Sequence, residues 1–193
     1  PEKYRKIYDS VPVDTLLNRP NLPEGKSGDI GRRNVIDYFA CVSGVDEQIG
    51  KILNKLEETG QAENTIVIFT ADHGEMMGSH GLMQKVVYYE ESFRVPFIAR
   101  WPDKIKPGEG GLHLSTPDIM PTLLGLMGVK EGIPANIEGN DYSRTFQGIP
   151  EEKPEFALYI NSSFPSALGG MRGLRNDRYT FVIQRDNQGE VLE

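Results

Sequence analysis

Two histidines, an aspartate and a lysine lie close together in residues 70–85, whose sequence is TADHGEMMGSHGLMQK. A carboxylate oxygen of Asp72 and an imidazole nitrogen of His73 are suitable ligands for one divalent cation. Neighbouring side chains of a regular strand point to opposite faces, so both can reach one ion only where the strand has ended, and Gly74 permits such a bend. A second interpretation stays open on these residues alone, in which Asp72 caps a turn and His73 packs against its neighbours.

The same stretch carries two further polar candidates, His80 and Lys85. Lys85 offers a fixed positive charge to an anionic group such as sulfate or phosphate, although a solvated side chain is the usual fate of a lysine. His80 is a candidate catalytic residue or, alternatively, a hydrogen-bonding residue that holds the loop. Together, His73, Glu75 and His80 match no trusted metal-ligand spacing. Three glycines flank the two histidines: Gly74, Gly78 and Gly81.

A short apolar run, residues 64–70, comes directly before this stretch. Its β-branched residues predict a strand buried on both faces, as in a parallel sheet, and open α/β sheets bind ligands at the carboxyl ends of such strands. Residues 95–101 are a second candidate strand. An amphipathic helix that ends near Gly60 is predicted before both strands, because apolar residues recur at steps of three and four. Those residues are Val35, Phe39, Val42, Val45, Ile49, Ile52 and Leu56.

The first residues and the middle of the chain show weaker patterns. Residues 1–31 are rich in proline and glycine and poor in apolar periodicity, which predicts an extended segment along the surface. Thr116 is the predicted N-cap of a short helix over residues 119–127, and Gly128 is its predicted end.

The last part of the chain predicts a strand at residues 156–160 and a hairpin at residues 172–183 that turns at Asn176. The order helix, strand, strand, helix, hairpin predicts an α/β fold. We expect a partial, mostly parallel sheet flanked by helices, with a small C-terminal antiparallel hairpin extension. The expected domains are a partial α/β domain at residues 1–150 and a small antiparallel portion at residues 151–193.

The amino-acid composition excludes several classes of function. The 193 residues include 21 Lys+Arg and 28 Asp+Glu, which gives a formal net charge of −7. This acidic balance argues against general nucleic-acid binding, which needs a basic face. One cysteine excludes an internal disulfide framework and a cysteine-rich metal site. No stretch approaches the roughly 20 apolar residues of a membrane-spanning helix.

Several blocks of the sequence resemble the sulfatase family, and they occur in the family's order. Any single block is a weak signal, whereas the ordered series is specific. The blocks are residues 38–46, 48–50, 64–74, 80–82, Lys85, residues 89–96, 116–124 and 172–179.

The resemblance implies a member of the alkaline-phosphatase-like superfamily that cleaves sulfate esters around one divalent metal, commonly calcium. By the family pattern, Asp72 and His73 are metal ligands and Lys85 contacts the sulfate group. His80 lies in a block that matches the family, and we consider it a candidate catalytic residue. Glu90 and Arg94 also match, and we expect a structural role from them. The family further implies a periplasmic or extracellular location and a sulfate-ester substrate, either a small molecule or a glycan.

The sequence also departs from the family. Sulfatases carry a C/S-x-P-S/A-R motif whose first residue becomes the formylglycine nucleophile, and no such motif occurs here. Cys41 lies in the amphipathic helix and is expected to be a small core residue. The family's N-terminal pair of metal-binding aspartates is absent as well. We therefore expect a C-terminal-half fragment of a sulfatase, with formylglycine in the missing half.

Such a fragment is expected to be inactive on its own and to bind metal weakly, because calcium needs more ligands than two. Exposed sheet edges are expected to favour self-association. Two alternatives remain open. One is a phosphoryl or phosphonate ester hydrolase of the same superfamily, because sulfate and phosphate are both tetrahedral oxyanions. The other is a non-catalytic interaction module with a vestigial site.

Overall fold

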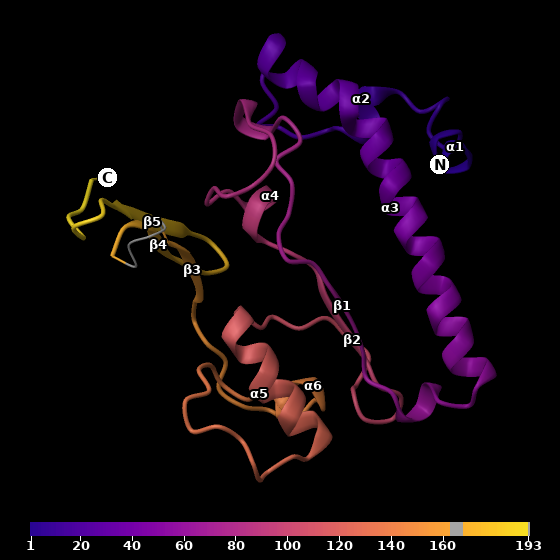
Figure 1. Ribbon diagram of the computed structural model, residues 1–193, viewed down its shortest axis with the longest axis vertical. Helices are drawn as coiled ribbons and strands as arrows, with labels where there is room; N and C mark the ends of the chain where they lie inside the picture. Colours follow the sequence, from indigo (N-terminus) through magenta and orange to yellow (C-terminus); the bar gives the residue numbers. More distant parts are fainter. Residues whose placement is uncertain (163–167, 193) are drawn as a thin grey trace. The chain divides into compact units, whose positions relative to one another are not determined.

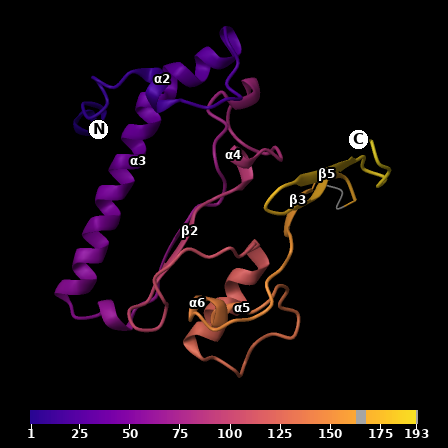
Figure 2. The same cartoon turned by 180° about the vertical axis from the view of Figure 1, so that it is seen from behind.

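The computed structural model describes residues 1–162 and 168–192 and forms two compact units, Pro1–Pro102 and Asp103–Glu193. Figures 1 and 2 show the elements of each unit from opposite sides. The units divide at residue 102, whereas the sequence predicted a domain boundary at residue 150. This division does not test that boundary, which stays a prediction.

The first unit is built on one long helix, α3, which spans Lys26–Glu58. The amphipathic helix predicted from residue 35 is confirmed, and it begins nine residues earlier than the apolar pattern does. Two glycines that suggested a loop lie inside this helix and are buried. A Cβ atom on Gly28 would lie 2.0 Å from the carbonyl oxygen of Pro23, and one on Gly31 would lie 2.2 Å from that of Met77. These glycines therefore allow the backbone to pack closely.

Residues before α3 are not extended, so that prediction is wrong. They form two short helices, α1 at Glu2–Arg5 and α2 at Val13–Leu16, which both contact α3. The side chain of Tyr4 is buried, and an ion pair of 2.6 Å joins Lys3 to Glu47 of α3. Proline and glycine here separate helical turns that are too short to show periodicity in the sequence.

A small apolar core joins this N-terminal region to the segment that follows β1. Its buried members are Leu17, Val35 and Met77. Partly buried side chains surround them: Val13, Leu16, Leu22, Ile36, Phe39 and Met83. Cys41 lies outside this core and is exposed on α3, so its expected role as a core residue is wrong. The core thus packs against residues 76–83, part of the stretch that carries the candidate site.

Both predicted strands of this unit exist, but their arrangement differs from the prediction. β1 spans Val67–Thr70, just after the short helix η1 at Ala62–Asn64, and β2 spans Phe97–Arg100. They pair antiparallel, and Phe69 of β1 is 37% exposed. Within residues 1–162 and 168–192 only antiparallel pairs occur, so the predicted parallel sheet is not shown there. A β-branched apolar run predicts a strand, but it does not determine the direction of the neighbouring strand.

The second unit contains a helix and a three-stranded antiparallel sheet. Helix α5 spans Thr116–Met127, and a capping box between Ser115 and Asp118 begins it. Ser115 therefore takes the N-cap position predicted for Thr116. Gly128, with a φ of 71°, ends the helix as predicted.

The short helix α6, Ser143–Phe146, is followed by the sheet. Its strands are β3 at Ala157–Ser162, β4 at Gly170–Arg175 and β5 at Thr180–Arg185, in that order. The predicted strand and hairpin are thus confirmed. Among the described residues, no helix is both long and apolar enough to cross a membrane.

Candidate functional site

Asp72 and His73 follow the last residue of β1, where the alternation of strand side chains no longer applies. The backbone N–H of His73 donates to Oδ1 of Asp72 at 3.0 Å, which folds the carboxylate back toward the histidine. Oδ2 of Asp72 then lies 3.4 Å from Nε2 of His73. The strand end thus brings the two predicted side chains together, as their proposed chemistry requires.

The geometry of this pair suits a shared cation. Two ligand atoms about 2.4 Å from one calcium ion and at right angles to each other lie about 3.4 Å apart. Nδ1 of His73 bonds the carbonyl oxygen of Gly74 at 2.7 Å and must donate its proton there. In the neutral imidazole Nε2 then carries the lone pair, and a carbonyl behind a metal-binding imidazole is a common outer partner.

Gly74 is required by close packing. Its N–H donates to the carbonyl oxygen of Ser92 at 2.6 Å, and an added Cβ would lie 2.0 Å from the carbonyl oxygen of Glu91. The backbone after His73 thus rests directly on the short helix α4, Glu90–Phe93. Any side chain at position 74 would push these two segments apart.

Residues 74–86 form what we call the site loop, and Glu75 holds its two sides together. One carboxylate oxygen of Glu75 accepts hydrogen bonds from the backbone N–H groups of Met77, at 3.1 Å, and Gln84, at 2.6 Å. The part of the chain that the structure describes contains no group of three His, Cys, Asp or Glu side chains that could hold a metal ion. His73, Glu75 and His80 are therefore not a metal site, and Glu75 has a structural role.

The backbone of the site loop is strained. Met77, His80, Gln84 and Val86 all have positive φ, from 44° to 77°, a region that non-glycine residues rarely adopt. Lys85 lies between two of these residues, and its side chain is exposed. No ion pair with Lys85 is found among the described side chains. Strain of this kind persists only where surrounding contacts enforce it, and it clusters at functional sites.

Contacts that enforce this conformation come from residues 19–23, which we call the strap. Arg19 donates from one guanidinium nitrogen to the carbonyl oxygen of Met76, at 2.8 Å, and to the hydroxyl of the fully buried Ser79, at 3.0 Å. The carbonyl oxygen of Asn21 accepts the backbone N–H of His80 at 2.8 Å. Neither strap residue was predicted from the sequence, because isolated polar residues between prolines carry no pattern.

His80 is exposed on the loop and stacks on the ring of Tyr89, with 3.8 Å between ring centroids. Nε2 of His80 lies 2.9 Å from the amide nitrogen of Asn21, which also donates to Glu91 at 2.5 Å. Partial burial raises the pKa of Glu91, but hydrogen bonds from Asn21, its own backbone and Ser79 lower the pKa below its usual value overall. His80 thus holds the loop, which is the alternative left open by its sequence, while its catalytic role stays a prediction.

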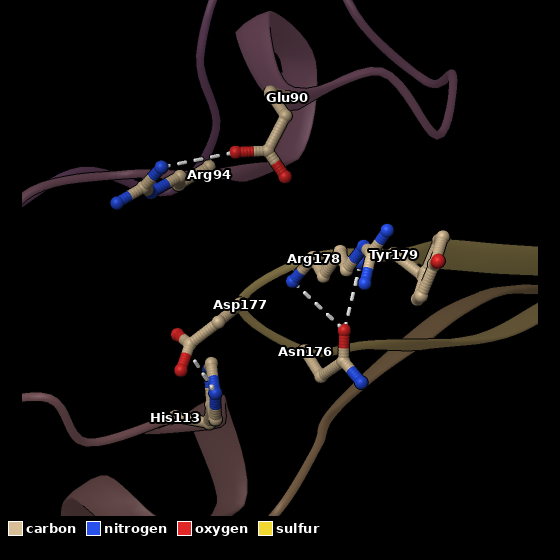
Figure 3. A network of polar contacts seen from close by, with 7 residues as sticks. All are labelled: Glu90, Arg94, His113, Asn176, Asp177, Arg178 and Tyr179. Atoms are coloured by element: carbon tan, nitrogen blue, oxygen red, sulfur yellow. Dashed lines mark hydrogen bonds and ion pairs between the residues drawn. The ribbon is translucent and has the colours of Figure 1, made fainter.

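Glu90 and Arg94 form an ion pair of 3.1 Å across one turn at α4 (Figure 3). Both side chains are substantially exposed. The pair supports the helix on which Gly74 rests, in line with the structural role expected of it.

The second unit has its own polar cluster at the tip of the β4–β5 hairpin (Figure 3). Oδ1 of Asn176 accepts the backbone N–H groups of Arg178, at 2.9 Å, and Tyr179, at 2.7 Å. Asp177 lies 3.4 Å from Nε2 of His113, a residue of the segment before α5. These contacts shape and anchor the turn.

Comparison with known proteins agrees with the sequence blocks. The family model described as "Sulfatase" matches residues 1–129. A second model, described as "N-sulphoglucosamine sulphohydrolase, C-terminal", matches residues 78–191. Together they cover the site loop, α5 and the three-stranded sheet.

Named relatives and solved structures match across most of the chain. An endo-4-O-sulfatase of Bacteroides thetaiotaomicron is 38% identical over 97% of this chain and 39% of its own length. An N-acetylglucosamine-6-O-sulfatase of the same organism is 43% identical over 76% of this chain and 27% of its own length. The chain therefore spans well under half the length of these relatives.

The fold also matches solved structures. The yidJ structure from Bacteroides fragilis superposes with a TM-score of 0.91 at 36% identity, over 100% of this chain and 42% of that chain. The phosphonate monoester hydrolase of Agrobacterium radiobacter superposes with a TM-score of 0.70 at 26% identity, over 83% of this chain and 34% of that chain. With an α/β sulfatase-like fold, a matching family model and relatives of this identity, the chain belongs to the sulfatase family.

Proposed function

We propose that this chain supplies metal ligands and a sulfate contact to a metal-dependent sulfuric ester hydrolase. The observation that carries the proposal is the pair Asp72 and His73, whose Oδ2 and Nε2 atoms lie 3.4 Å apart directly after β1. The hydrogen bond from His73 to Gly74 supports it, because it leaves Nε2 as the ligand atom.

Asp72 and His73 are the residues that would hold the ion, which we propose to be calcium. A bound divalent ion polarises the oxygen of an ester group and neutralises charge as it develops. Lys85 is the proposed sulfate contact, because a fixed ammonium group stabilises an anionic group next to it. The loop contacts of Glu75 and Arg19 hold the backbone that leads up to Lys85, as far as Gln84, and so limit where its side chain can reach.

Residues outside this chain complete the proposed site. Calcium takes about six to eight oxygen ligands, so Asp72 and His73 alone hold it weakly. The formylglycine motif of the family is absent from this sequence, and we propose that the nucleophile belongs to another part of the whole protein. The same part is proposed to add parallel strands beside β1, because β1 pairs only with β2 among the described residues and its other edge has no neighbouring strand there. By itself the chain is therefore expected to hydrolyse no sulfate ester.

The names of the relatives support a proposal for the class of substrate. Two of them are named for sulfate groups on carbohydrates, at the 4-O position and at O6 of N-acetylglucosamine. These names favour a sulfated saccharide over a sulfated lipid. We further propose an extracytoplasmic location, where such polymers occur.

The test uses the whole sulfatase that contains this chain, with metal content and aryl-sulfate hydrolysis measured together. The Asp72→Ala variant should lose bound calcium and at least about a hundredfold in kcat/KM, a typical cost of removing a key electrostatic group. Lys85→Ala should keep its calcium and lose activity, whereas Lys130→Ala, at another exposed lysine, should change neither. Unchanged activity and metal content in Asp72→Ala would instead support a non-catalytic interaction module.

A second candidate is a phosphonate ester hydrolase, favoured by the structural match to the Agrobacterium enzyme. The ligand pair cannot separate the two candidates, because both substrates present a tetrahedral oxyanion. Comparing kcat/KM for an aryl sulfate and the matching aryl phosphonate on the same protein decides between them. A higher value for the phosphonate would replace the sulfatase proposal.

A further inference from the structure

Asn21 of the strap contacts the site loop through both its backbone and its side chain. Its carbonyl oxygen accepts the N–H of His80, and its side-chain nitrogen lies 2.9 Å from Nε2 of His80 and 2.5 Å from a carboxylate oxygen of Glu91. One amide group thus joins the strap to both the site loop and α4. Neither Asp72 nor His73 takes part in these contacts, so direct metal binding does not explain them.

The hydrogen bonds of the Asn21 side-chain amide determine which ring nitrogen of His80 carries the proton. An ionised carboxylate only accepts hydrogen bonds, so the Asn21 atom that faces Glu91 must be the NH₂ group. The same NH₂ group faces Nε2 of His80, and its second hydrogen requires an acceptor there. Nε2 must therefore carry the lone pair, and the single imidazole proton must lie on Nδ1.

We infer that Asn21 is a positioning residue that holds His80 as the neutral imidazole with its proton on Nδ1. In this state Nε2 is occupied by Asn21 and the ring is stacked on Tyr89, so His80 fixes the site loop and does not act as a general base. The loop conformation depends on this contact, because His80 itself has a positive φ of 54°. The site loop also carries Lys85, and only the expected effect of this contact on substrate binding rests on the proposed function.

Nitrogen-15 NMR of the imidazole groups in the 193-residue chain tests the inference, with His80 assigned by its loss in His80→Gln. In the unsubstituted chain at neutral pH, Nε2 of His80 should give the signal of an unprotonated ring nitrogen. Asn21→Asp replaces the donor by an acceptor, and the signal should move to that of a protonated Nε2. Tyr89→Leu removes the stacking partner and should leave the signal unchanged. A protonated Nε2 in the unsubstituted chain would overturn the inference.

Measuring kcat and KM of the whole sulfatase distinguishes a positioning role of His80 from a catalytic role. The Oε1 atom of glutamine can accept the Asn21 hydrogen bond in place of Nε2, so His80→Gln should keep kcat within about threefold, while His80→Ala should raise KM. Loss of a general base lowers kcat by about 10²–10⁴, and such a loss in His80→Gln would contradict the inference. If Asp72→Ala is active while the His80 signal is as expected, the proposed function fails and the inference stands.

Discussion

The site loop and the tip of the β4–β5 hairpin are both tight polar turns, but they are held in different ways. At the hairpin tip, Asn176 accepts hydrogen bonds from residues two and three positions further along the chain. In the site loop, Glu75 bridges the backbone locally, and Arg19 and Asn21 add contacts from 57 to 60 positions away. The hairpin tip also contacts a distant residue, His113, but Asn176 alone closes its backbone, whereas the strained backbone of the site loop is also held by the strap.

The largest effect should come from filling the space between α3 and the site loop. Gly31→Ala places a Cβ atom against the Met77 carbonyl, where the backbone cannot easily move, and should destabilise the first unit by about 1–3 kcal/mol. Gly50→Ala is the matched control, because nothing lies within 4 Å of an added Cβ on that part of the same helix. The control should be neutral or stabilising by up to about 1 kcal/mol. Urea unfolding measures both variants, and equal stability of the two would contradict the close-packing account.

The next effect concerns the carboxylate that closes the site loop. Glu75→Ala leaves the backbone N–H groups of Met77 and Gln84 without their acceptor and should cost about 1–3 kcal/mol. Glu75→Gln keeps an oxygen in the same place and should cost less. Amide hydrogen exchange at residues 77 and 84 reports the loop directly. Slow exchange in Glu75→Ala would show that the loop is held without this residue.

A smaller effect is expected at the hairpin. Asn176→Ala removes the acceptor for two exposed backbone N–H groups and should cost about 1 kcal/mol, confined to the second unit. Asn176→Asp preserves the acceptor and serves as the control. If Asn176→Ala also speeds exchange in the site loop, the two turns are not independent and the comparison between them fails.

The smallest effect is a pH dependence at the attachment of α1. Hydrogen bonds from Lys3 and Lys51 lower the pKa of Glu47 from 4.5 to about 2. Because the pKa is lowered in the folded chain, this contribution to stability is complete above pH 4.5 and is lost as the pH falls toward 2. The NMR signals of the Tyr4 ring should report release of α1 over that range. In the Glu47→Gln variant, which has no carboxylate at this position, the Tyr4 signals should not change over this pH range in the same way.

The sequence allowed prediction of the elements with strong local signals. The helix around Val35, the two strands beside Asp72, the helix ended by Gly128 and the hairpin at Asn176 are all present. The antiparallel pairing of β1 and the helices within residues 1–31 were not predicted. Strand direction and very short helices depend on contacts with distant residues, so local patterns do not determine them.

Some residues of the candidate site could likewise be predicted from the sequence, and others could not. Asp72 and His73 were identified from their residue types and their place after a strand, and the structure brings their side chains together. Arg19 and Asn21 could not be identified, because their role depends on three-dimensional proximity to Ser79 and His80. Glu75 was considered as a metal ligand, and its position shows that it instead organises the loop.

The link from Asn21 to Glu91 also has a consequence for how the chain folds. It joins residues 70 positions apart, and the helix α3 lies between them in sequence. Contacts of such long range form slowly, since the entropy of closing the intervening chain must be overcome first. Helix α3 can form early from local interactions, and the site loop then acquires its final geometry late, when the two ends of this long segment meet.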